Sequence, residues 1–215
     1  MIKNYLKIAL RNLWKYKVFT GINVLGLSLA IGASVLLLLT AFKQLSFDRF
    51  HANRDRLYRL YWEAYKAAGV ERSAGMPAPV RAAIEENAPG VAAVARWAGW
   101  SATVLRDGQP LELGINFTEP DFFRMFSFPL LQGDAERALA DPNGVVLSQR
   151  YAERIFGAAD PMGQPLEVVL QGHRLNLVVT GIAEEAPDQS SLRYGMITRF
   201  EKYPTYDEEK ERWDN

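Results

Sequence analysis

Residues 18–42 read VFTGINVLGLSLAIGASVLLLLTAF and contain no Asp, Glu, Lys, Arg or His. As a helix, this run of about 25 residues is about 37 Å long, and the hydrocarbon core of a bilayer is about 30 Å thick. A buried helix of a soluble protein is the alternative, although one of this length and uniformity is unusual. A cleavable leader has a shorter apolar region that ends in small residues, and Leu39-Thr40-Ala41 matches such an end poorly. We therefore predict an uncleaved transmembrane helix over residues 18–42.

A basic stripe precedes the apolar run, because Lys3, Lys7, Arg11 and Lys15 recur at every fourth residue. A second face of the same segment is apolar, at Ile2, Leu6, Ala9, Leu13 and Tyr16. This pattern is typical of a helix that lies in the interface of an anionic leaflet, and a simple basic flank is the alternative. We predict an amphipathic basic interfacial helix over residues 1–17, in contact with the lipid bilayer.

Small residues share one face of the predicted transmembrane helix, at Gly26, Ala30 and Ala33. Small side chains at this spacing let a second helix approach closely, although they are also common in any membrane helix. We predict that these three residues form a helix-packing face.

The orientation of the helix cannot be obtained from charge alone, because its two flanks carry equal numbers of Lys and Arg. Long domains cross a membrane largely regardless of their charge. We therefore expect the short N-terminal segment to stay in the cytoplasm and residues 43–215 to be extracytoplasmic.

The remainder of the chain predicts a mixed domain of helices and strands, of the α+β class. Strands are expected over 57–65, 91–105, 111–117, 144–147, 166–170 and 175–182, and helices over 77–87, 120–126 and 148–156. Asp107-Gly108 is a strong hairpin signal, Ser148 is placed to begin a helix, and Gly157 is placed to end it. After Pro187 the pattern weakens and no closing strand is visible, so we expect the domain of residues 43–215 to be incomplete at its C-terminus.

Few residues suggest catalytic or ligand chemistry. The chain has no cysteine and no net charge, which gives no support to thiolate sites or to binding of nucleic acid. His51 and His173 lie far apart in sequence, and neither has another His or a Cys three or four residues away, so a zinc site is not expected. Carboxylate pairs such as Asp48 with Asp55 are abundant on any protein surface. We therefore expect no enzyme activity, no catalytic residues, no metal and no cofactor.

Residues 116–134 have a distinctive sequence, NFTEPDFFRMFSFPLLQGD, which is rich in phenylalanine. Its phenylalanines predict an aromatic cluster, and its proline and glycine residues fix the chain around that cluster. We interpret the segment as a packed hydrophobic corner that builds the fold.

This segment resembles the signature x-P-x-F-F-x-x-F-x-F-P-L-L-x-G-D of the periplasmic core domain in MacB/FtsX-like ABC transporter permeases. Further segments resemble the same family in the same order: YLKIALRNLW at 5–14, INVLGL at 22–27, FDRFH at 47–51, VVLS at 145–148, DPMG at 160–163, and VTGI at 179–182 with PDQSS at 187–191. Together these matches cover most of the chain.

The resemblance implies a permease subunit that dimerises with a second permease copy and works with a cytoplasmic ABC ATPase in the bacterial cytoplasmic membrane. Helix motion driven by the ATPase would be passed to the extracytoplasmic domain, for export or mechanotransmission. The family carries further transmembrane helices, and the sequence shows one, so we expect the chain to be truncated. A stand-alone membrane-anchored binding or scaffold module is the alternative. No Walker loop is present to bind a nucleotide, which agrees with a separate ATPase.

Overall fold

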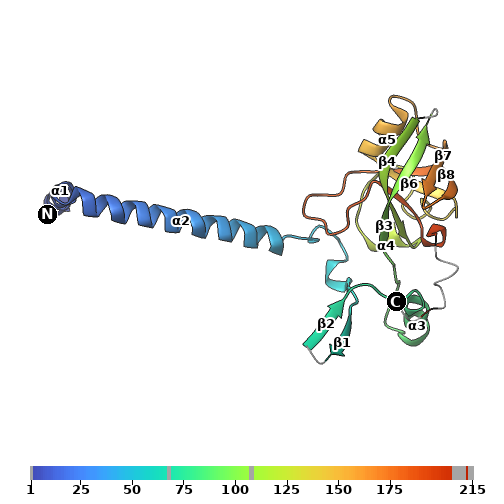
Figure 1. The fold of residues 1–215 in the computed structure, drawn as a ribbon, viewed down its shortest axis with the longest axis horizontal. Coiled ribbons are helices and arrows are strands. Elements are labelled where there is room, and N and C mark those ends of the chain that lie inside the picture. The colour runs from blue at the N-terminus through green and yellow to red at the C-terminus, as the bar shows by residue number, and fades with distance from the viewer. Residues whose placement is uncertain (1, 67–68, 107–108, 205–211, 213–215) are drawn as a thin grey trace. The chain divides into compact units, whose positions relative to one another are not determined.

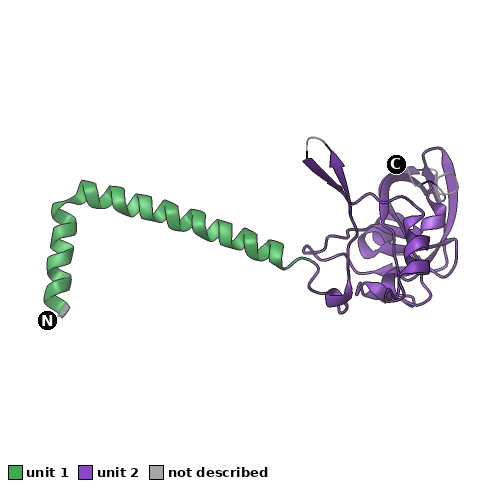
Figure 2. Cartoon of the chain, turned by 90° about the horizontal axis from the view of Figure 1, so that it is seen from below, with its two compact units in different colours: residues 1–47 green, residues 48–215 purple. Residues whose placement is uncertain are grey.

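The computed structural model describes residues 2–66, 69–106, 109–204 and 212, and it divides into two compact units. Unit 1 comprises residues Met1–Phe47 and unit 2 comprises residues Asp48–Asn215 (Figure 2). Unit 1 contains α1 (Ile2–Lys15) and α2 (Lys17–Leu45). The two helices are separated at Tyr16, whose backbone leaves the helical region with φ −111° and ψ 45°.

Helix α2 contains the whole predicted apolar run and extends it at both ends. It is the one helix among the described residues that is long and apolar enough to cross a membrane. A core helix of a soluble protein would bury its apolar side chains, and α2 buries none; Leu37, for example, is 72% exposed. This composition suits the interior of a bilayer, because each Leu or Ile favours insertion by about 0.3–0.6 kcal/mol.

Unit 2 contains short helices and two sheets, whose arrangement is shown in Figure 1. The helical elements are η1 (Arg54–Arg56), α3 (Val80–Asn87), α4 (Phe122–Met125), α5 (Gln149–Phe156) and η2 (Phe200–Lys202). The strands are β1 (Trp62–Lys66), β2 (Gly69–Ser73), β3 (Ala98–Arg106), β4 (Gln109–Thr118), β5 (Leu130–Gln132), β6 (Gly144–Ser148), β7 (Pro165–Leu170), β8 (His173–Ala183) and β9 (Met196–Arg199). This mixture confirms the predicted α+β class.

The larger sheet closes on itself. Its 7 strands run in the order β5-β8-β6-β9-β4-β3-β7, and β8 also pairs with β7. Strand β8 can do this because it is long: residues 173–178 pair with β7, and residues 178–183 pair with β6. The pairs β4–β9 and β6–β8 are parallel, and the other pairs are antiparallel. Closure leaves β5 as a short addition to one edge of β8.

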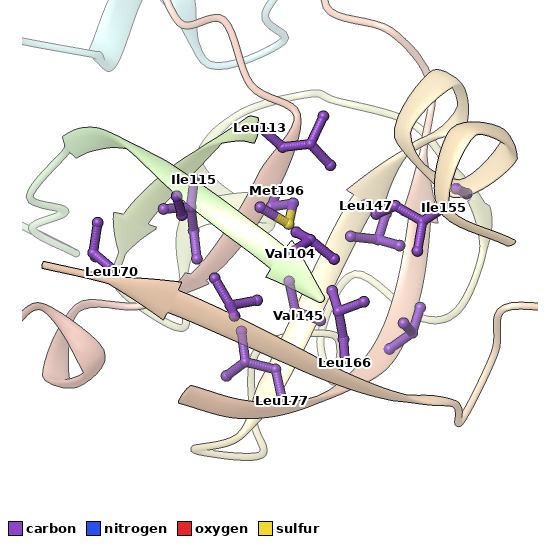
Figure 3. Close-up of a cluster of buried hydrophobic side chains, with 14 of the residues drawn as sticks. Val104, Leu113, Ile115, Val145, Leu147, Ile155, Leu166, Leu170, Leu177 and Met196 are labelled. Atoms are coloured by element: carbon purple, nitrogen blue, oxygen red, sulfur yellow. The ribbon is translucent and has the colours of Figure 1, made fainter. Parts of the chain in front are cut away.

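Two hydrophobic clusters lie on opposite sides of strand β6. Val145 and Leu147 point into the cluster enclosed by the closed sheet, which also contains Val104, Ile115 and Met196 (Figure 3). Val146 points the other way, into a second cluster rich in phenylalanine. Because both faces are covered, the strand is apolar at successive positions, as expected of a strand buried on two sides.

Helix α5 forms where it was predicted. The Ser148 side chain accepts a hydrogen bond from the Tyr151 backbone N–H at its start, and Gly157 ends it with φ 62°. Ala152 and Ile155 are buried on its inner face. Strands β7 and β8 likewise form the predicted hairpin, and β3 pairs antiparallel with β4, while the turn predicted at 107–108 lies outside the described residues.

Two predicted strands begin later than expected, since neither has a partner for its first residues. The strand predicted over 57–65 begins at Trp62, whose partner Ser73 is the last residue of β2. The strand predicted over 91–105 begins at Ala98, because its partner β4 ends at Thr118.

The prediction that no strand follows Pro187 was wrong. Strand β9 occupies residues 196–199 and lies inside the sheet, parallel to β4 and antiparallel to β6. Met196, Ile197 and Thr198 are all buried. A four-residue strand that is covered on both faces shows no alternation of apolar and polar residues, so its sequence carries little strand signal.

Candidate functional site

The segment Asp48–Asn53, which we call the strap, follows the apolar helix directly. Only Ser46 and Phe47 separate it from Leu45, the last residue of α2. Within unit 2 the strap is held by two loops that lie far along the chain, residues 124–128 and 187–192. The strap is therefore the first segment of unit 2 that follows α2 along the chain.

Asp48 connects the strap to the second loop through three hydrogen bonds. Its backbone N–H donates to the Gln189 carbonyl at 2.8 Å. Its carboxylate accepts from the Ser191 N–H at 2.9 Å and from the Ser191 hydroxyl at 2.5 Å. Hydrogen bonds to an ionised carboxylate are about twice as strong as neutral ones. Asp48 adopts φ 56°, a left-handed conformation that aspartate tolerates better than most residues.

The other end of the strap is held by the first loop. The Ala52 N–H donates to the Ser127 hydroxyl at 2.9 Å, and the Asn53 amide donates to the Met125 carbonyl at 3.2 Å. The strap is thus hydrogen-bonded at both ends to segments that are more than seventy residues away in sequence.

His51 lies between these two attachments and is only 3% exposed. Its Nδ1 accepts the Ser127 N–H at 3.1 Å, which requires the neutral imidazole with its proton on Nε2. The ring packs among Phe50, Phe126 and Phe128, with centroid distances of 4.0, 5.3 and 5.1 Å. The imidazole therefore serves as a buried hydrogen-bond acceptor.

Burial lowers the pKa of His51 below its usual 6.5, and the nearby Asp48 carboxylate opposes this shift. The distance from His51 Nε2 to Asp48 Oδ1 is 4.0 Å, and Nε2 has no hydrogen-bond partner among the described residues. Protonation would place a charge on Nδ1 and remove its ability to accept from Ser127. The hydrogen bond between the strap and Ser127 N–H therefore requires a neutral His51.

The phenylalanine-rich segment predicted to build a packed corner forms the surface on which His51 rests. Phe122 and Phe128 stack with their centroids 5.7 Å apart, and Tyr194 packs edge-on against Phe128. These contacts confirm the predicted aromatic cluster. The strap packs against this cluster through His51.

A second polar contact ties α3 to the closed sheet. Glu119 is 1% exposed, and its carboxylate lies 2.6 Å from Arg96 Nε and 3.0 Å from Arg81 Nη1. Burying a carboxylate is costly unless it is paired, and the two guanidinium groups provide this pairing. These ion pairs therefore hold α3 against the ends of β3 and β4.

An open cleft of about 510 Å³ lies over the start of β3, the middle of β4 and the start of α5. Its lining includes Gly99, Gly114, Arg150 and Arg193. Each arginine has a carboxylate 3.6 Å away, Glu185 for Arg150 and Asp188 for Arg193. Among the described residues, no group of three or more His, Cys, Asp or Glu could hold a metal ion.

The structure places the predicted packing and interface residues on exposed helix surfaces. Gly26, Ala30 and Ala33 share one face of the continuous helix α2, where a Cβ added at Gly26 would meet nothing within 4 Å. Lys3, Lys7, Arg11 and Lys15 recur along one side of α1 and are exposed. Their roles in helix packing and in lipid contact remain predictions.

The sequence did not reveal the strap contacts. In the sequence, Asp48 suggests only a surface carboxylate pair with Asp55, and His51 suggests only a metal ligand without partners. The one available signal was that FDRFH and PDQSS both resemble family segments, and the structure brings these two segments together.

Residues 20–212 match the family model described as the MacB-like periplasmic core domain. The chain belongs to this family. The match begins inside α2 and runs through the strap, the closed sheet and β9, so it covers both units of this MacB-like chain.

One solved structure has a similar fold, and two further structures match more weakly. A domain of a putative permease protein from Porphyromonas gingivalis aligns with a TM-score of 0.55 at 21% identity, over 72% of this chain and 65% of that one. The periplasmic region of MacB from Actinobacillus actinomycetemcomitans gives 0.44 at 12% identity, over 59% and 56%. The extracellular domain of the noncanonic ABC-type transporter YknZ from Gram-positive bacteria gives 0.43 at 19%, over 57% and 62%. The MacB-like chain thus spans less than two thirds of the length of these structures. No curated protein matched it.

Proposed function

We propose that this MacB-like chain is a permease-type subunit of an ABC transporter in a bacterial cytoplasmic membrane. Its N-terminus would lie in the cytoplasm, and residues 43–215 would lie outside. A cytoplasmic ABC ATPase and a second permease copy would be its partners. The chain itself would couple helix motion to the outer domain, for export or mechanotransmission, without catalysing a reaction.

The observation that carries this proposal is the strap. A transmembrane helix can move a domain only if the connection between them is short and firmly attached, since a long flexible linker would absorb the motion. Here Ser46 and Phe47 are the only link, and the strap that follows is hydrogen-bonded through Asp48, His51, Ala52 and Asn53. An anchor whose only purpose was to retain a domain at the membrane would not need these contacts.

The N-terminal helix fits the cytoplasmic side of the same proposal. Its basic stripe, Lys3, Lys7, Arg11 and Lys15, would lie against anionic lipid or against the ATPase. Each Lys or Arg near an anionic surface contributes about 1 kcal/mol of binding.

Orientation can be tested by site-directed labelling, because the chain has no cysteine of its own. We expect a membrane-impermeant maleimide to label Glu153→Cys on α5 in intact spheroplasts. Tyr5→Cys on α1 should react only after the membrane is made permeable. The reverse pattern would contradict the proposed orientation.

The partners can be tested by purifying the full chain from its native membrane in mild detergent and identifying what co-purifies. We expect an ABC ATPase and a second permease copy. Gly26→Leu should weaken their retention, whereas Ser28→Leu, a similar enlargement on the opposite side of α2, should leave it unchanged. Recovery of the chain alone would favour the anchored binding or scaffold module.

Coupling through the strap can be tested by hydrogen exchange in the purified complex. Trapping the ATPase with vanadate should change amide protection in residues 48–53 and 187–192. Helix α5 provides an internal control, because it makes no hydrogen bond to the strap. Unchanged protection in the strap and its loops would contradict the coupling role.

A further inference from the structure

The two histidines of the chain differ in their surroundings, because His51 is buried in the strap and His173 is exposed. Histidine is the side chain whose charge changes most readily between pH 5 and 8. A histidine at an attachment point makes that attachment depend on pH when only one protonation state fits the contacts. The surroundings of His51 meet this condition at both ring nitrogens.

The first nitrogen, Nδ1, holds the strap to the first loop (residues 124–128) by accepting the Ser127 N–H at 3.1 Å. A proton on Nδ1 would turn this acceptor into a donor that faces another donor. The Ala52 N–H and the Asn53 amide bind the same loop, at the Ser127 hydroxyl and the Met125 carbonyl. Loss of the His51 contact therefore weakens this whole end of the strap.

The second nitrogen, Nε2, has no hydrogen-bond partner among the described residues, although buried polar groups normally have one. The rings of Phe50, Phe126 and Phe128 surround the imidazole and contain no oxygen that could accept a hydrogen bond. The Asp48 carboxylate lies 4.0 Å from Nε2. The pocket thus accommodates a neutral ring and offers an imidazolium little in place of water.

Charged side chains are present on the elements that pack against His51. Arg49 of the strap, Arg124 of the first loop and Asp188 of the second loop are all exposed, and Asp48 is half-buried. Burial lowers the pKa of His51 below its usual 6.5, and the charge of Asp48 opposes this shift. Once the ring reaches water its pKa returns to about 6.5, so acid favours the released form.

We propose that the strap is an acid-released latch, in which protonation of His51 frees residues 51–53 from the first loop while Asp48 keeps its hydrogen bonds to Gln189 and Ser191. With one attachment in place of two, the strap can pivot at Asp48. The consequence for coupling rests on the proposed function, in which the strap passes helix motion to unit 2. A pivoting strap would pass that motion on less firmly in acid.

The size of the effect follows from the linkage between protonation and release. For a latched form that binds no proton and a released form with a pKa of about 6.5, the ratio of released to latched strap rises about tenfold per pH unit below 6.5. Between pH 7.5 and 5 this ratio should therefore increase by up to about thirtyfold.

Site-resolved hydrogen exchange of the full chain in detergent measures this ratio, once each rate is divided by the intrinsic rate at the same pH. We expect protection of the Ser127 and Ala52 N–H groups to fall by about ten- to thirtyfold between pH 7.5 and 5. The Ser191 N–H, which Asp48 accepts, is the internal control and should change by less than about threefold. Unchanged protection at Ser127, or an equal fall at Ser191, would overturn the proposal.

Variants of the two histidines identify the titrating group. His51→Asn places an amide oxygen near the position of Nδ1 and does not titrate in this range, so protection at Ser127 should not depend on pH, whatever its level. His173→Asn is the matched control and should keep the wild-type response. A response at Ser127 that persists in His51→Asn would mean that another group titrates, and it would overturn the assignment to His51.

Asp48→Asn provides a further check, because it removes the charge that raises the pKa of His51. Release at Ser127 should then occur at lower pH than in the wild type. Release at the same or a higher pH would contradict the assigned role of Asp48 and overturn the latch as described.

The latch and the proposed function can fail separately, because the exchange measurement uses neither ATPase nor nucleotide. Purification of the chain without an ATPase would contradict the proposed function and leave the pH response of Ser127 unaffected. Protection at Ser127 that does not depend on pH would overturn the latch, and the vanadate experiment would still decide whether the strap couples helix motion to unit 2.

Discussion

At the scale of single residues, Asp48 and His51 explain how a short segment can be held firmly. Asp48 uses its backbone N–H and both carboxylate oxygens, while His51 supplies an acceptor from inside an aromatic environment. Each of these bonds closes a loop of more than seventy residues, so each restricts the chain much more than a local turn would.

Replacing Asp48 with Asn should lower the free energy of unfolding by about 1 kcal/mol, because the charge-assisted bonds from Ser191 are weakened while the side chain is partly exposed. Denaturant unfolding of the full chain in detergent measures this loss. Asp55→Asn is the matched control, since the Asp55 side chain is 89% exposed, and it should change stability by less than about 0.5 kcal/mol. Equal effects of the two substitutions would show that the Ser191 contact does not contribute.

The lowered pKa of His51 predicts a specific dependence of stability on pH. Between the folded-state and unfolded-state pKa values, the unfolded chain binds more protons, so stability rises with pH in that window. The contribution is complete above the unfolded value of about 6.5 and is lost as the pH falls from there through the folded-state pKa.

Unfolding measured from pH 7.5 down to 5 should therefore show a smaller loss of stability in His51→Phe than in the wild type. His173→Asn is the control, because His173 is exposed, and it should retain the wild-type slope. An unchanged slope in His51→Phe would show that His51 has the same pKa in the folded and the unfolded chain, and would contradict the lowered pKa.

At the scale of elements, helix α5 packs closely against β4 and against Gly195, the residue that precedes β9. The Tyr151 hydroxyl accepts the Gly114 N–H at 3.1 Å, and the Tyr151 ring lies over Gly195, where an added Cβ would overlap ring atoms. The absence of a side chain at residue 195 therefore allows the helix to pack where it does.

Gly195→Ala should destabilise unit 2 by about 1–3 kcal/mol, because the Tyr151 ring must move. The same substitution in a Tyr151→Ala background should have a much smaller effect, since the obstacle is gone. Gly90→Ala serves as the control, because a Cβ there meets nothing within 4 Å. Denaturant unfolding of the four variants gives the coupling energy, and additive effects of Gly195→Ala and Tyr151→Ala would contradict this packing.

At the scale of the whole molecule, the two units differ in how they bury their apolar residues. Helix α2 buries none of its side chains, whereas unit 2 buries two clusters that share strands β6, β8 and β9. Because the clusters share these strands, unit 2 should unfold as one cooperative body.

Residues 48–215 expressed without unit 1 should accordingly fold, remain in solution and give one cooperative thermal transition. Circular dichroism of this fragment and of the full chain in detergent should give melting temperatures within a few degrees of each other, about 2–4 °C per kcal/mol being typical at this size. A broad or absent transition in the fragment would show that unit 2 needs unit 1 or lipid in order to fold.

The sequence by itself determined the parts of this protein that depend on local pattern. The apolar run of residues 18–42 identified the candidate membrane helix, because exposure to lipid requires apolar residues on every face. Ser148 and Gly157 fixed the ends of α5 through their own backbone and side-chain chemistry. The phenylalanine segment indicated both the aromatic cluster and the family.

Only the tertiary structure decided which distant segments meet. Asp48 and Ser191 are separated by 143 residues, and no local periodicity encodes such a contact. Strand β9 was missed because burial on both faces removes the alternation by which strands are recognised. The exposure of Tyr65 and Val70 in the β1–β2 hairpin could not be predicted from sequence either. Strands rich in aromatic residues have the same composition whether or not another element covers them. Local sequence specifies the conformation of a segment, whereas the folding of the whole chain decides which other segments lie next to it.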